Sequence, residues 1–125
     1  MVDAADAKDI DAYMLADQHL DEVIHQACRN TFAVQAVTPM IVQCRRFWYA
    51  YQYEGDLEAG AQAHLTLAEG IQDGNPEQAL QGSETLMAYL SAFTRKVIDK
   101  PIDQLLIIWR HHESERNPRS HRYPL

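Results

Sequence analysis

Two aspartates interrupt the apolar face of the first long helix that the sequence predicts. Between Ile10 and Cys28, apolar residues recur at the three- and four-residue spacing of one side of an α-helix. Asp17 falls at the centre of this side, and Asp21 lies on it one turn later. A buried carboxylate without a partner is energetically costly. The pair therefore predicts a cation, dense hydrogen bonding or a wet cavity at this place.

A histidine interrupts the apolar face of a second predicted helix, over residues 57–72, in the same way. His64 lies at the centre of the face that is formed by Leu57, Ala61, Leu67, Ala68 and Ile71. Carboxylates together with an imidazole suit Zn²⁺, Ni²⁺ or Mn²⁺, and helical bundles build such sites from facing helices. We therefore predict a divalent metal bound by Asp17, Asp21 and His64.

The same residues also have a structural interpretation, in which no metal is present. His64 is then a hydrogen-bonded core histidine, and the two aspartates form ion pairs with Arg45 or Arg46. Alternatively, one of these arginines holds the carboxylate of a ligand directly.

Two further side chains are candidates for ligand binding. His25 lies one turn after Asp21, at the edge of the apolar face. Tyr89 lies off the apolar face of a helix predicted over residues 76–98, from where it reaches a neighbouring cavity. We assign both, with Arg45 and Arg46, to the ligand-binding group.

Five helices and no strand are expected, which predicts an all-α antiparallel bundle. The expected ranges are 9–28, 31–53, 57–72, 76–98 and a last helix that opens at Pro101. Asn30 caps the second helix, and Pro39 should kink or break it. The sequence from about residue 113 is polar and should form a loose tail.

Composition excludes several classes of protein. The chain has 125 residues, a length typical of one domain, and a formal net charge of −7 that argues against nucleic-acid contact. It contains neither a membrane-length apolar run nor a signal peptide. Cys28 and Cys44 lack CxxC spacing and are expected as reduced core residues. Nucleophile, P-loop and HExxH motifs do not occur. We expect a cytoplasmic protein that is not an enzyme.

Six short motifs follow one another between residues 9 and 99. They are Asp17-Gln18-His19-Leu20-Asp21, Asn30, Thr38-Pro39-Met40, Arg45-Arg46, Ala63-His64 and Gly74-Asn75-Pro76-Glu77. Their order and spacing resemble the C-terminal effector-binding (FCD) domain of FadR-type GntR transcription regulators. The resemblance implies a bundle with a central pocket that binds a small carboxylate effector.

In many members of that family, a divalent metal in the pocket binds the effector. Four ligands are implied: an Asp, a His four residues later, a His on a middle helix and a His on the last helix. Asp17 and His64 match the first and third positions, and Asp21 replaces the histidine of the second. Leu86 stands at the fourth position and cannot bind metal. A shift of one turn would instead use Asp21 with His25.

The resemblance also predicts a boundary within the chain. Family members carry a winged helix-turn-helix and further helices before the matching segment, so we interpret this chain as a fragment or a truncated form. Residues 1–100 are expected to form the ligand-binding bundle, and residues 101–125 an additional helix and tail. Residues 105–109, LLIIW, are apolar on every side of a helix, which predicts a homodimer with residues 102–109 at or near the interface.

The sequence thus predicts the ligand-binding and dimerisation domain of a GntR-type regulator, which senses a small organic acid. The alternative is a structural or interaction domain with a vestigial metal site and no effector.

Overall fold

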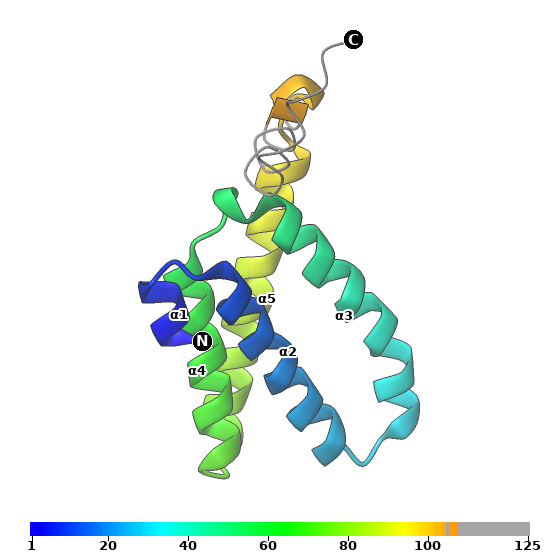
Figure 1. Ribbon diagram of the computed structural model, residues 1–125. Coiled ribbons are helices and arrows are strands. Elements are labelled where there is room, and N and C mark those ends of the chain that lie inside the picture. Colours follow the sequence, from blue (N-terminus) through cyan, green and yellow to red (C-terminus); the bar gives the residue numbers. More distant parts are fainter. Residues whose placement is uncertain (105, 108–125) are drawn as a thin grey trace.

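The described part of the protein is built from α-helices. A computed structural model describes residues 1–104 and 106–107, within which no strand occurs. The elements are α1 (Val2–Asp6), α2 (Ile10–Ala27), α3 (Thr31–Tyr51), the 3₁₀ turn η1 (Gln52–Glu54), α4 (Leu57–Gln72) and α5 (Pro76–Ile98) (Figure 1). The predicted all-α fold is confirmed. None of the described helices is both long and apolar enough to span a membrane.

The four long helices begin at side chains that cap their first turn. The carboxylate or amide oxygens of Asp9, Asn30, Asp56 and Asn75 each accept a hydrogen bond from the backbone N–H three residues later. Such caps satisfy N–H groups that have no partner within the helix. These local contacts explain why the observed helix bounds lie within two residues of the predicted ones. The short helix α1 was not expected.

Helices α4 and α5 form a closely packed antiparallel pair. Gly74, with a φ of 64°, makes the turn between them. A Cβ atom added at Gly82 would lie 2.6 Å from the Cα atom of Leu67, and one added at Gly70 would lie 2.7 Å from the Cα atom of Ala79. Glycine at both positions therefore permits a backbone contact that a side chain would prevent.

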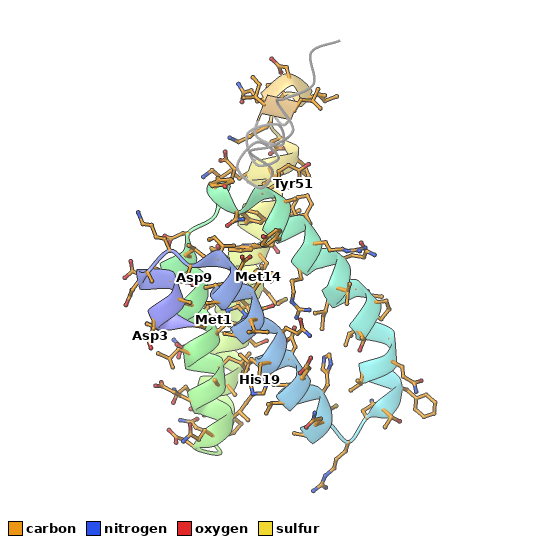
Figure 2. All side chains as sticks on the ribbon, in the orientation of Figure 1. Met1, Asp3, Asp9, Met14, His19 and Tyr51 are labelled. Atoms are coloured by element: carbon orange, nitrogen blue, oxygen red, sulfur yellow. The ribbon has the colours of Figure 1, made fainter. Side chains whose placement is uncertain are left out.

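An aromatic core joins α2, α3 and α5. The rings of Tyr13 and Trp48 stack with their centroids 5.4 Å apart. The ring of Phe93 packs beside that of Trp48, with a distance of 6.1 Å between the two ring centroids. Met1 and Met14 pack against the edge of this cluster (Figure 2). The core thus holds α2 and α3 against α5.

Helix α3 is less buried than the sequence predicted. Its N-terminal half leads away from α5, and residues 28–30 join it there to α2 (Figure 1). Phe32 and Met40, two apolar positions of this helix, are 83% and 64% exposed. Cys28 and Cys44, expected in the core as reduced residues, are free but exposed. The apolar pattern of a helix does not reveal whether another element covers it.

Pro39 does not break α3, contrary to one of the two expected outcomes. Proline cannot donate to the carbonyl four residues earlier, which belongs to Gln35. Both residues are exposed, so water can satisfy this carbonyl. The helix therefore continues through the proline.

The apolar helix that the sequence predicts after α5 was expected to be buried. Ile102, Leu106 and Ile107 are 76%, 51% and 65% exposed. Leu105, Ile108 and Trp109 lie outside the described residues. The division of the chain near residue 100 and the predicted dimer interface stay predictions.

Candidate effector site

Arg45 links α3 to the two aspartates of α2. Its Nε–H donates to Asp17 Oδ2 at 2.8 Å, and its Nη2–H donates to Asp21 Oδ2 at 2.5 Å. The two aspartates are four residues apart, so their carboxylates are stacked on one side of α2 and reach the same guanidinium. This ion pair links the two helices at a point between the aromatic core and the turn at residues 28–30.

His64, on α4, contacts the same pair of aspartates through Asp17. Its Nε2 lies 3.1 Å from Asp17 Oδ1, and its Nδ1 lies 2.7 Å from the carbonyl oxygen of Gly60. Both neighbours are acceptors, so the ring satisfies both contacts only when both nitrogens carry a proton. We call these four side chains, Asp17, Asp21, Arg45 and His64, the charged cluster.

The charged cluster perturbs the acidity of its members. Burial acts to raise the pKa of Asp17, but hydrogen bonds from His64 and Arg45 hold it below its usual range. Burial and the charge of Asp17 raise the pKa of Asp21 despite its bond to Arg45. Burial acts to lower the pKa of His64, but Asp17 and the Gly60 carbonyl raise it above the usual value. Both acceptor contacts thus favour the protonated form of His64 more than in a free imidazole at the same pH.

The raised pKa of His64 predicts that stability falls with rising pH. A folded-state pKa above the unfolded value gives stability that is complete below about pH 6.5 and is lost as pH rises through the folded pKa. We expect the midpoint of urea unfolding of the wild-type chain to decrease as pH rises above about 6.5. His64→Gln should flatten this dependence, and an equally steep decrease in that variant would contradict the assignment.

The predicted metal ligands come together, but the guanidinium of Arg45 lies between them. Asp17 Oδ2 and Asp21 Oδ2 both accept from Arg45. Leu86, at the fourth ligand position, is buried and only 7% exposed. Within residues 1–104 and 106–107, no three His, Cys, Asp or Glu side chains gather in a way that could hold a metal ion. The residues as arranged do not fit a divalent cation, and the metal stays a prediction that requires Arg45 to move.

A small hollow adjoins the charged cluster at His64. Its volume is about 170 Å³, and its other lining residues are Met1, Val2, Ala16, Leu20, Ala61, Leu65 and Ala68. Pockets for drug-sized ligands usually measure about 300–1,000 Å³. The hollow therefore suits only a few non-hydrogen atoms of an apolar group.

The other predicted ligand-binding residues are distributed around this centre. His25 is half-buried, and its charge acts on Asp21. Arg46 is exposed, whereas Arg45 points into the cluster. Tyr89 has a buried hydroxyl and packs near Gly60, one turn of α4 before His64. No described contact joins Arg46 or Tyr89 to the charged cluster.

Two contributors to the site were not predicted. Gly60 supplies the carbonyl that orients His64, and such a backbone role leaves no pattern in the sequence. Tyr13 is one of the apolar residues between Ile10 and Cys28, and it lies one turn before Asp17, whose charge acts on its hydroxyl. The spacing of four residues from Tyr13 to Asp17 to Asp21 was the available indication.

Comparison with protein families identifies this arrangement of helices. A family model described as the FCD domain matches residues 1–89, which is more than half of the chain. The chain belongs to the FCD domain family. The match covers α1–α4 and most of α5, including every residue of the charged cluster. No curated protein and no solved structure matches the chain.

The FCD family defines the general role of the chain. FCD domains are effector-binding regulatory domains of GntR-type transcription regulators, and they are not enzymes. The resemblance inferred from the six sequence motifs is thereby confirmed.

Proposed function

We propose that this FCD domain senses a small organic acid, which binds at the charged cluster and regulates a GntR-type transcription factor in the cytoplasm. One observation carries the proposal. Charged side chains from α2, α3 and α4 meet at one half-buried point, beside the hollow at His64. A ligand at this point contacts three helices at once, so that its binding favours one arrangement of them over others.

The burial of the charged cluster supports a functional role. The side chains of Arg45, Asp17 and His64 are 18%, 20% and 14% exposed. Ion pairs at this depth contribute little net stability compared with apolar residues of the same size. Packing alone does not require charged side chains at this position, whereas recognition of an anionic ligand does.

A thermal-unfolding screen of small carboxylic acids tests the proposed function. Each acid is added to the whole chain, with EDTA in one series and with Zn²⁺, Ni²⁺ or Mn²⁺ in another. A ligand at about 100 times its dissociation constant should stabilise the folded state by about 2.7 kcal/mol. Stabilisation that rises with the logarithm of the acid concentration above the dissociation constant supports the proposal. If no acid stabilises the chain in either series, the alternative, an interaction domain without an effector, is favoured.

We also propose that the domain acts as a homodimer with residues 102–109 at or near the interface. The support is apolar surface within this segment: Ile102, Leu106 and Ile107 are 76%, 51% and 65% exposed. Apolar surface of this kind often marks an interface.

Sedimentation velocity at micromolar concentration should give the mass of a dimer. Ile102→Glu is expected to shift the chain toward monomer, because it places a charge in an apolar contact. Asp103→Lys also changes a charge but removes no apolar group, and it should keep the dimer. A monomeric wild-type chain would contradict the proposal.

A further inference from the structure

The charged cluster already contains a cation that has unused hydrogen-bond donors. Two of the five N–H groups of Arg45 donate to Asp17 and Asp21. Within the described residues, no acceptor takes the other three. The side chain is 18% exposed, so a small molecule from solvent can reach it. A guanidinium with free N–H groups is the side chain best suited to bind a carboxylate through two parallel hydrogen bonds.

The two aspartates differ in how firmly they are held. Both oxygens of Asp17 are engaged, one by Arg45 and the other by His64. Only Oδ2 of Asp21 has a partner among the described residues. The Asp21 side chain is also more exposed, at 31% against 20% for Asp17. Asp21 is therefore the carboxylate that leaves the guanidinium more easily.

We propose that Arg45 binds the carboxylate of the effector directly, without a metal, and that this carboxylate replaces Asp21 on the guanidinium. A third carboxylate added beside two aspartates would be repelled by both. Exchange avoids this repulsion, because Arg45 again lies between two carboxylates. Asp17 stays bound to His64 and fixes the position of Arg45. The inference rests on the proposed function, since it assumes that the effector is a carboxylic acid.

Acetate tests the exchange, because it resembles the side chain that Asp21→Ala removes. We expect acetate in the presence of EDTA to raise the unfolding temperature of Asp21→Ala at concentrations at least ten times lower than those needed for the wild type. Combining Asp21→Ala with Arg45→Met should abolish this response. Asp11→Ala is the matched control, because Asp11 is an exposed carboxylate of α2 that accepts from the Tyr49 hydroxyl and has no arginine partner within the described residues. It should respond to acetate like the wild type.

If Asp21→Ala does not fold, Asp21→Asn provides the same test with the volume conserved. It should bind acetate about ten times more tightly than the wild type, as measured by calorimetry. Equal acetate binding by wild type and variant, or binding that requires added Zn²⁺, would overturn the inference.

The failure of this inference is distinguishable from failure of the proposed function. An acid from the screen that binds equally well to the wild type, Asp21→Asn and Arg45→Met overturns the exchange and leaves the proposed function intact. If acetate restores Asp21→Ala through Arg45 but no acid binds the wild type, the carboxylate site at Arg45 is supported and the sensing function fails.

Discussion

Replacing Arg45 with methionine is expected to lower the free energy of unfolding by about 2–3 kcal/mol. The change leaves Asp17 and Asp21 close together without their shared cation, at side-chain exposures of 20% and 31%. Removing one partner of a buried ion pair costs about 3–5 kcal/mol, and partial exposure reduces this value. Urea unfolding of the variant and of the wild type measures the difference.

Two variants show whether the loss comes from the unpaired charges. Arg46→Met removes an exposed arginine next to Arg45 and should change stability by less than about 0.5 kcal/mol. Adding Asp17→Asn and Asp21→Asn to Arg45→Met should restore most of the loss, because replacing a whole ionic group is often nearly neutral. If the triple variant is no more stable than Arg45→Met, the lost packing of the arginine explains the effect and the ion pairs do not.

Replacing Gly82 with alanine is expected to destabilise the fold by about 2 kcal/mol, although alanine is the better helix former. Helix propensity alone predicts a gain of about 1 kcal/mol. The added Cβ would, however, lie 2.6 Å from Leu67 Cα and 2.9 Å from the carbonyl carbon of Thr66, both backbone atoms of α4. Backbone cannot move aside as a side chain does, so α4 and α5 must separate and lose their packing.

The sign of the change at Gly82 is the decisive result, and thermal unfolding measures it. Gln81→Ala changes an exposed neighbour on α5 and should have little effect or stabilise slightly. Gly70→Ala should destabilise like Gly82→Ala, because its Cβ meets the backbone of Ala79 from the other helix. A stabilised Gly82→Ala would contradict the close contact between α4 and α5.

The sequence predicted the helices well because their ends are determined locally. Asn30 and Asn75 cap the turns that they begin, and Gly74 provides the left-handed turn between α4 and α5. Burial was predicted less well, since it depends on which elements meet. Phe32 and Met40 follow the apolar pattern of α3, yet both side chains are exposed.

The sequence predicted which residues of α2 and α4 form the candidate site. It predicted only in part which cation balances the charge of the two aspartates. Polar residues at the centre of apolar faces identified Asp17, Asp21 and His64, and the structure brings them around one point. The sequence left open whether a metal or an arginine balances the aspartates, because Arg45 is 24 residues away from the nearer of the two. Only the three-dimensional arrangement of α2 and α3 selects Arg45 over the exposed Arg46.

The central claim is that an organic acid binds at the charged cluster, and NMR of the arginine side chains tests it most directly. The Nε–H of Arg45 donates to Asp17 and therefore reports on the centre of the site. The acid that gives the largest stabilisation in the screen is titrated into the wild-type chain with EDTA present. We predict that the Arg45 Nε–H signal shifts and saturates at the dissociation constant measured by calorimetry, while that of Arg46 stays in place. Saturable binding that leaves the Arg45 signal unchanged would contradict the account.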